Sequence, residues 1–226
     1  DAQLLADLVR VNYLPRVWLA PRDTRELRRL VRFRAQLVQR RTDTKLRIRG
    51  LLRENRQKCL VAQAWTKNWY AWLATADLSE SDRWIINEHL EELVSLSGRI
   101  GAVEAKIKAR LKDDPVAQIL LAQPGVGMVT AATMRAEIGR FDRFNSGKQL
   151  SRFCGVTPRN ASSGARQADA GLIKAGNSEL RVVLVELAHR LISRIKGRWA
   201  DLAHRMLIRG KPKNVTVAAI ANRWVR

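Results

Sequence analysis

The sequence contains little of what zinc-binding, disulfide-bonded or membrane proteins need. It has two cysteines, Cys59 and Cys154, in 226 residues, and neither lies in a CxxC or other ligand-rich pattern. We therefore expect two reduced thiols, buried or incidental, as in a cytoplasmic protein. The three histidines are scattered, which argues against a zinc site. No apolar run reaches the roughly 18 residues of a membrane-spanning helix, and no signal peptide is recognisable.

Acidic residues are also scarce. Lys and Arg number 42 against 21 Asp and Glu, which gives a net charge of +21. A protein this basic usually meets a polyanion, most often nucleic acid, and a membrane surface is the weaker alternative. With 46% hydrophobic and 28% charged residues the chain is globular rather than disordered. It begins at Asp1 without a methionine, which we interpret as a fragment or a processed product.

Segments that alternate like β-strands are almost absent, whereas apolar residues recur at helical spacing nearly everywhere. We expect a mainly α fold in three parts. Residues 1–20 form a short helix and an extended piece, the tail of a domain cut off upstream. Residues 21–112 form two long helices in an antiparallel coiled-coil hairpin. Residues 113–226 form a compact helical domain, which is punctuated by glycines.

Basic side chains are dense in the first long helix, where residues 22–56 contain 13 basic and 4 acidic residues. A charged helix face is often simply solvated, but an excess of one sign favours a surface that faces nucleic acid. Residues 113–226 contain 19 basic and 8 acidic residues, so the positive charge is not confined to the hairpin. Trp65, Trp69 and Trp72 form one helical stripe. Stacking on unpaired bases is compatible with it, although we expect packing against the hairpin.

The turn Pro124-Gly125-Val126-Gly127 lies between two apolar runs and predicts a helix-hairpin-helix. Gly125 and Gly127 allow positive φ and a close approach of backbone to ligand. The amides of the turn and of the helix that follows, which includes Thr130, then form an anion site. Such contacts hold DNA phosphates without reading sequence. The alternative is an ordinary tight turn between two helices that contacts no ligand.

Ser163, in the turn Ser162-Ser163-Gly164, is a candidate nucleophile. A serine hydroxyl that attacks a phosphodiester needs an exposed turn and cations that stabilise the pentavalent phosphate. Such cations lie close in the sequence, namely Arg159, Arg166 and Lys174. The residue pattern alone is that of an ordinary loop, so it leaves catalysis open.

A second turn, from Gly171 to Asn177, leads into a helix of about residues 178–196. Lys174 and Arg181 in and after this turn are candidates for phosphate contacts. A solvated loop with a helix cap explains the same pattern, and the residues do not separate the two interpretations.

Four motifs in order, PGVG, AEIGRFDRF, LSRFCGVTPRNASSG and GLIKAGNSELR, resemble the C-terminal domain of DEDD-type insertion-sequence transposases. This family includes the Piv-type DNA invertases and the bridge-RNA-guided recombinases. The resemblance covers Asp113 to Arg226. The hairpin and the DAQLLADLV start also fit the family's middle region.

The resemblance implies an enzyme that cleaves and rejoins DNA during transposition, with the family's serine falling on Ser163. It also implies an acidic Asp-Glu-Asp-Asp set that binds Mg2+, whose last member falls on Asp1. The other three acidic residues would lie upstream, so we expect the fragment alone to be inactive and to bind no metal. A homo-oligomer formed through the coiled coil, a structured guide RNA and a location at the bacterial nucleoid are implied as well. The alternative function is a non-catalytic nucleic-acid-binding remnant.

Overall fold

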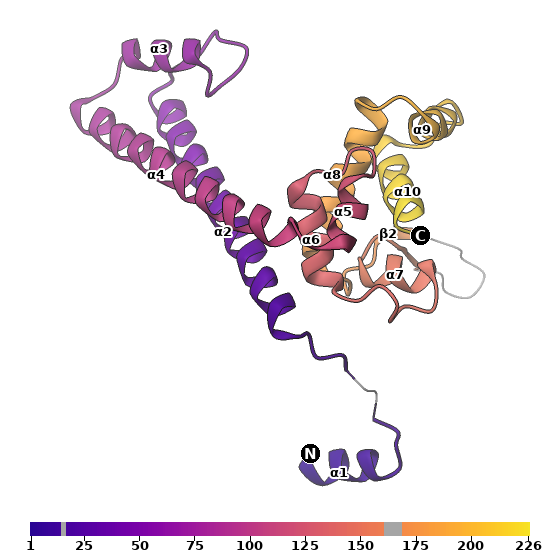
Figure 1. The fold of residues 1–226 in the computed structure, drawn as a ribbon. Helices are drawn as coiled ribbons and strands as arrows, with labels where there is room; N and C mark the ends of the chain where they lie inside the picture. The colour runs from indigo at the N-terminus through magenta and orange to yellow at the C-terminus, as the bar shows by residue number, and fades with distance from the viewer. Residues whose placement is uncertain (15–16, 161–168) are drawn as a thin grey trace.

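The computed structural model describes residues 1–14, 17–160 and 169–226. It is mainly helical, as the sequence predicts (Figure 1). None of the described helices is both long enough and apolar enough to span a membrane. The described elements are, in order, α1 (Ala2–Arg10), α2 (Arg22–Glu54), α3 (Lys67–Thr75), α4 (Glu80–Leu111), α5 (Pro115–Leu121), α6 (Met128–Ile138), α7 (Gly147–Phe153), β1 (Pro158–Asn160), β2 (Asp169–Leu172), α8 (Ser178–Ser193), α9 (Arg198–Ile208) and α10 (Lys213–Val225).

The two longest helices, α2 and α4, lie side by side and run in opposite directions, with α3 at the far tip (Figure 1). Apolar residues at helical spacing make the shared face, which is why both helices bury one stripe and expose the rest. Trp69 is buried at the tip together with Leu73 and Ile86. Trp65 lies before α3 and has a φ of +70°, so the three tryptophans do not form the single helical stripe that the sequence predicted. Their packing against the hairpin is as expected, and Trp69 is not available for base stacking.

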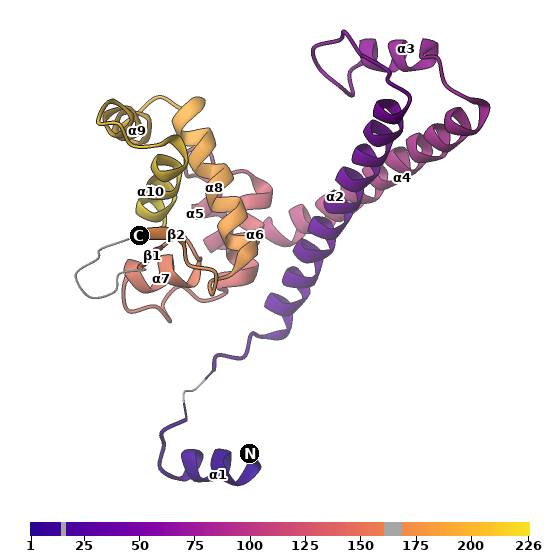
Figure 2. The same cartoon turned by 180° about the vertical axis from the view of Figure 1, so that it is seen from behind.

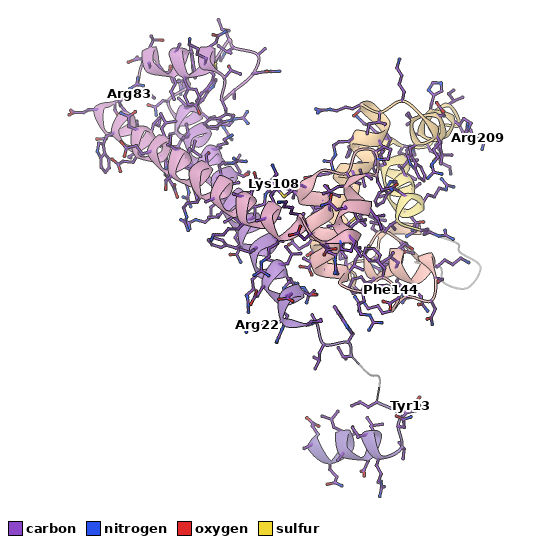
Figure 3. The ribbon with its side chains drawn as sticks, viewed as in Figure 1. Tyr13, Arg22, Arg83, Lys108, Phe144 and Arg209 are labelled. Atoms are coloured by element: carbon purple, nitrogen blue, oxygen red, sulfur yellow. The ribbon has the colours of Figure 1, made fainter. Side chains whose placement is uncertain are left out.

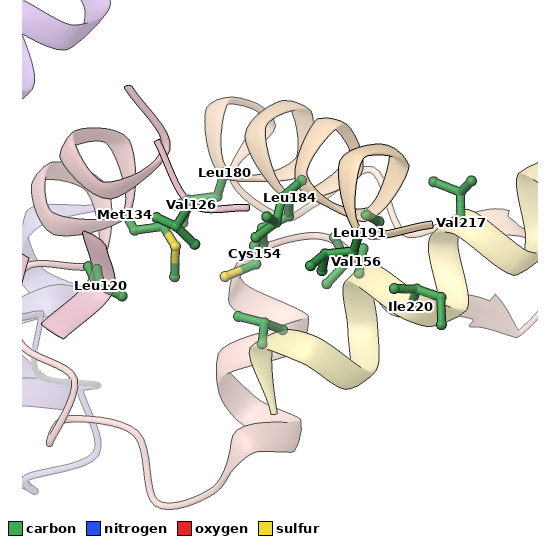
Figure 4. Packing of buried hydrophobic residues seen from close by; sticks show 14 of the residues in the cluster. Leu120, Val126, Met134, Cys154, Val156, Leu180, Leu184, Leu191, Val217 and Ile220 are labelled. Carbon is green, nitrogen blue, oxygen red and sulfur yellow. The ribbon is translucent and has the colours of Figure 1, made fainter. Parts of the chain in front are cut away.

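The C-terminal residues pack around α8, which contacts α6, α9 and α10 and contributes several leucines to the shared core (Figure 4). Cys154 and Val156 lie in this core, and both are fully buried. Burial raises the pKa of the Cys154 thiol to about 12, so it stays protonated. Both cysteines are free thiols, and Cys59 is only partly buried. The thiols are thus unpaired, as predicted, and Cys154 is buried.

Helix α6 joins the hairpin to this core because it is buried on two sides. Ala132 and Ala136 pack into the cluster formed by α2 and α4, whereas Met134 and Ile138 pack into the C-terminal cluster. Alanine has almost no side chain, so it allows the backbone of α6 to approach α2 closely. The base of the hairpin is thereby fixed to the part of the chain that contains the PGVG turn.

A small sheet that the sequence pattern did not predict lies beside α10 and α7 (Figure 2). Strands β1 and β2 pair antiparallel, with Pro158 opposite Leu172 and Asn160 opposite Asp169. The expectation that strands are almost absent missed this pair, because strands of three and four residues are too short to show an alternating pattern.

Candidate nucleic-acid interface

The PGVG turn connects α5 to α6, which begins at Met128 as predicted. Gly125 has φ of +77°, so the turn requires a residue without a side chain there. A Cβ on Gly125 would also lie 2.9 Å from Ile195 Cδ1, whereas a Cβ on Gly127 would meet nothing within 4 Å. Gly127 is exposed and is the N-cap of α6, without a side chain that could accept from the first amides. The start of α6 therefore keeps its amides open for an anion.

Arg190 on α8 stabilises this turn through two hydrogen bonds. Its guanidinium donates from Nε to the Gly125 carbonyl at 3.1 Å and from Nη2 to Thr130 Oγ1 at 3.0 Å. The contact fixes the turn conformation and adds positive charge beside the first turn of α6. No sequence pattern indicates this role for Arg190, because it lies 65 residues after Gly125.

The side chains of two residues predicted to lie at the phosphate site are used within the protein. The Val126 side chain is buried, and its amide donates to the Gln123 carbonyl at 3.1 Å. Thr130 is 3% exposed, and its hydroxyl accepts from Arg190. Neither side chain is free to contact DNA, because each is used to fold the turn. The Val126 amide is thus used within the turn, whereas the predicted role of Thr130 concerns its backbone amide in the first turn of α6 and stays a prediction.

The second turn is fixed by two glycines that bring separate motifs together. A Cβ on Gly176 would lie 2.3 Å from the Gly155 Cα, so only glycine fits where the two backbones meet. Arg181 donates from Nη2 to the carbonyls of Lys174 and Gly176, which makes it a structural residue of the turn. Asn177 accepts from the Leu180 amide, so α8 is capped as expected. Lys174 remains exposed.

Ser163 and Arg166 lie outside the described residues, so the structure does not place them. The two strands that flank them are described, and their pairing brings Asn160 next to Asp169. Arg159 on β1 is exposed. Asn160 and Asp169 therefore lie side by side next to Arg159, and the second turn continues directly from β2.

Asp1 does not form a metal site with the described residues. It is exposed at the start of α1, its side chain makes no capping hydrogen bond, and α1 has no buried residue. Within residues 1–14, 17–160 and 169–226, no three His, Cys, Asp or Glu residues gather where an ion could be held. A single carboxylate does not fit a magnesium ion, which needs several oxygen ligands. Figure 1 shows α1 apart from the helices of the C-terminal region.

One buried acidic residue that sequence reasoning missed is Glu137 on α6. Its carboxylate accepts from Arg32 Nε at 2.8 Å and Nη2 at 2.9 Å, and from Asn177 Nδ2 at 2.8 Å. Arg28 Nε lies 3.6 Å away. Burial alone would raise the pKa of Glu137, but the hydrogen bonds from Arg32 and Asn177 and the two arginine charges lower it below its ordinary value. Glu137 thus connects α2 to the turn before α8.

A run of exposed basic residues surrounds α9, a helix that the sequence pattern did not resolve. Residues 194–213 contain one acidic residue, Asp201, and a set of basic residues that are all exposed. None of the ion pairs within the described part of the chain includes a member of this set. The set is Arg194, Lys196, Arg198, Arg205, Arg209, Lys211 and Lys213, which we call the α9 basic surface; Figure 3 labels Arg209 at its edge.

The fold and this surface define a basic helical protein, and comparison with known proteins gives its family. Residues 117–204 match the family model described as "Transposase IS116/IS110/IS902 family". Residues 1–56 match the DEDD-type IS110 model described as "Transposase". The chain therefore belongs to the IS110/IS116 family of insertion-sequence transposases, which confirms the resemblance found in the sequence.

Relatives with these names span more sequence than this chain. The transposase for insertion sequence element IS1111A of Coxiella burnetii (strain RSA 493 / Nine Mile phase I) is 30% identical over 231 residues, which cover 99% of this chain and 63% of the relative. The transposase for insertion sequence element IS1328 of Yersinia enterocolitica is 32% identical over 134 residues, which cover 58% of this chain and 40% of the relative. The chain thus spans less than two thirds of the length of either relative.

Proposed function

We propose that this chain is the DNA-holding and serine-bearing part of a transposase that cleaves and rejoins DNA strands when an insertion sequence moves. The observation that carries the proposal is the match of residues 117–204 to the transposase family. These residues contain the open amides at the start of α6, and they contain both strands that flank Ser163. In this proposal residues 1–20 are the tail of a RuvC-like domain, residues 21–112 a coiled coil and residues 113–226 the transposase domain.

DNA binding is supported by two kinds of phosphate-binding group. The open amides at the start of α6, beside the Arg190 guanidinium, suit one backbone phosphate. The α9 basic surface suits several more phosphates, because its side chains are exposed and have no carboxylate partner among the described residues.

Contacts between basic side chains and DNA phosphates release counterions. We expect at least about a tenfold loss of affinity for duplex DNA between roughly 50 and 200 mM salt. Fluorescence anisotropy measures it, and an affinity that does not change with salt contradicts DNA binding through phosphates.

The proposed reaction is a transesterification. Ser163 Oγ attacks the phosphorus of a DNA phosphodiester, the bond to the leaving strand's oxygen breaks, and the serine proton goes to that oxygen. The phosphoserine link retains the bond energy, and attack by the hydroxyl of another strand reverses the step. The described carboxylates do not gather into a metal site, so no step of this proposal runs through a metal ion; Mg2+ binding is a proposal for a longer protein that brings more carboxylates to Asp1.

The test of the reaction is a search for a covalent adduct. The protein, extended upstream to the length of its relatives, is incubated with labelled DNA containing the element's ends and with Mg2+, and is then denatured. We expect a denaturation-resistant protein–DNA band that is lost in Ser163→Ala and kept in Ser162→Ala, the matched neighbour. Ser163→Ala should bind DNA within a few-fold of the parent. If Ser163→Ala loses binding as well, the serine is structural and not the nucleophile.

The alternative function is a nucleic-acid-binding remnant without catalysis. The α9 basic surface favours it, because that surface binds a polyanion whether or not Ser163 reacts. Tight, salt-sensitive binding of element-end DNA without any adduct, in the extended protein, would decide for this alternative.

A homo-oligomer and a guide RNA are further proposals about partners. The hairpin exposes large apolar residues, including Phe33, Leu46 and Val94, which suit contact with a second copy. Light scattering of the parent and of Val94→Glu tests this, and a parent chain that is monomeric contradicts it.

A structured guide RNA is expected to compete with duplex DNA for the basic surfaces. A structured RNA that does not compete with DNA argues against a guide RNA.

A further inference from the structure

Two hollows share an edge beside α10, and residues of β1 and β2 also line one of them. The first has a cavity volume of about 560 Å3 and a mainly aliphatic wall, which includes Val156, Leu172 and Ala218. The second has a volume of about 580 Å3 and is lined by Ser146, Gly147 and Lys148 together with two arginines. Those arginines, Arg223 and Arg226, line both hollows.

The first hollow has the size and chemistry of a site for a flat heterocycle. Its volume lies within the roughly 300–1,000 Å3 of small-molecule sites. Two amides stand in its apolar wall, Asn214 and Asn222. Asn222 Nδ2 donates to the Val156 carbonyl at 3.1 Å, which fixes the side chain and leaves its oxygen as an acceptor. An aliphatic wall with one fixed amide and a second, exposed amide suits the faces and the polar edge of a nucleobase.

The second hollow supplies positive charge for the phosphate next to such a base. Arg223, Arg226 and Lys148 are exposed there, and among the described residues no Asp or Glu lines either hollow. The one side-chain contact of Arg223 within the described part of the chain is from Nη1 to the Met206 sulfur at 3.5 Å, a weak acceptor. Its guanidinium is therefore available to an anion, and two arginines with a lysine are complementary to phosphate.

We propose that the aliphatic hollow under α10 binds one unpaired nucleobase of a DNA strand, with the adjoining phosphate against Arg223 and Arg226. The inference rests on the proposed function, because it assumes that the nucleic acid bound by this chain is DNA. A base inside a duplex is stacked and cannot enter such a hollow, so the site requires a base that has left the stack. The hollow adjoins β1 and β2, so the captured base lies beside this strand pair.

The experiment compares two DNA probes of equal length, a fully paired duplex and a duplex with one unpaired 2-aminopurine. Anisotropy gives the affinities, and 2-aminopurine fluorescence reports whether the base is unstacked. We expect the parent chain to prefer the probe with the unpaired base and to raise its fluorescence. Ala218→Leu fills the hollow without changing its charge. It should lower the ratio of the two affinities about tenfold, while the affinity for paired DNA stays the same.

Controls separate filling the hollow from damage to the fold. Ala105→Leu, at an exposed position of α4, adds the same side chain elsewhere and should change neither affinity. Asn214→Ala, at an exposed position of the same hollow, should weaken the preference with less disturbance of α10. Arg223→Gln should lower the affinity for both probes, and it should lower the affinity for the probe with the unpaired base more.

The outcomes distinguish this inference from the function on which it rests. If the chain binds no DNA, both fail. If it binds duplex DNA in a salt-sensitive way but Ala218→Leu and Asn214→Ala leave the preference unchanged, the nucleobase site alone is wrong. If the preference appears with RNA probes of the same design and not with DNA, the occupant is RNA and the inference is overturned.

Discussion

The two most basic stretches of this chain use their side chains in different ways. On α2, the arginines Arg22, Arg28, Arg32, Arg34 and Arg40 form ion pairs with carboxylates of α2, α4 or α6. Around α9, no basic side chain takes part in an ion pair within the residues that the structure describes. Both stretches are equally conspicuous in the sequence, so the density of charge does not tell them apart. What distinguishes them is whether carboxylates lie opposite the basic side chains.

This difference separates charge used for folding from charge available to a ligand. Glu92 and Glu104 on α4 and Glu137 on α6 face α2 and hold its arginines. Among the described residues, no carboxylate holds the basic side chains around α9 in this way. The excess of one sign on α2 predicted a nucleic-acid surface there, but that excess is partly consumed at the junctions with α4 and α6. The α9 basic surface is therefore a candidate for DNA in which no basic side chain is ion-paired among the described residues, whereas α2 offers only the part of its charge that lies outside these junctions, such as Arg25, Arg29 and Arg47.

The largest effect is expected at Glu137. Glu137→Gln keeps the shape but leaves Arg28 and Arg32 without a carboxylate at a side chain that is 2% exposed. Breaking a buried ion pair costs about 3–5 kcal/mol, and because Arg32 is about half exposed we expect a loss of about 2–3 kcal/mol in the free energy of unfolding. Chemical denaturation measures it. The control is Glu92→Gln, whose ion pair with Arg40 is much more exposed and should cost under about 1 kcal/mol.

The pH dependence of the same pair has a definite sign. The pKa of Glu137 is lowered in the fold, so its contribution is complete above the ordinary carboxyl value of 4.5 and is lost as the pH falls through the lowered value. The stability difference between the parent and Glu137→Gln should therefore stay constant at neutral pH and shrink below about pH 4.5. A difference that is independent of pH would show that the carboxylate is not the stabilising group.

The α9 basic surface gives the next effect, and it is expected in binding rather than in stability. Replacing Arg198, Arg205 and Arg209 with Gln should lower DNA affinity about tenfold or more and reduce the salt slope by about 0.9 for each phosphate that is no longer neutralised. The matched triple variant replaces Arg22, Arg34 and Arg40, which are ion-paired on α2. It should change DNA affinity little. Equal decreases in both variants would remove the distinction between the two stretches.

The fold class, the long helices and the start of α6 could be predicted because each depends on a local pattern. Helical periodicity and the glycines of the PGVG turn lie within a few residues of the structure they specify. The contacts at the candidate site could not be predicted, because Arg32 reaches Glu137 across 105 residues and Arg190 reaches Gly125 across 65. Pairs at such separation leave no local pattern. For the same reason the sequence did not indicate that the Val126 side chain is buried and that the Thr130 hydroxyl accepts from Arg190.

The smallest effects test the same distinction within one turn. Gly125→Ala is strained by a φ of +77° and by contact with Ile195, and should cost about 1–2 kcal/mol of stability. Gly127→Ala has open space and an ordinary φ of −94°, so its stability should stay within about 0.5 kcal/mol of the parent. The added methyl group would instead stand before the open amides of α6 and weaken DNA binding a few-fold. Denaturation and anisotropy on both variants separate the two glycines. If Gly127→Ala leaves binding unchanged, the PGVG turn is an ordinary connection between two helices, and the phosphates of DNA are held by the α9 basic surface alone.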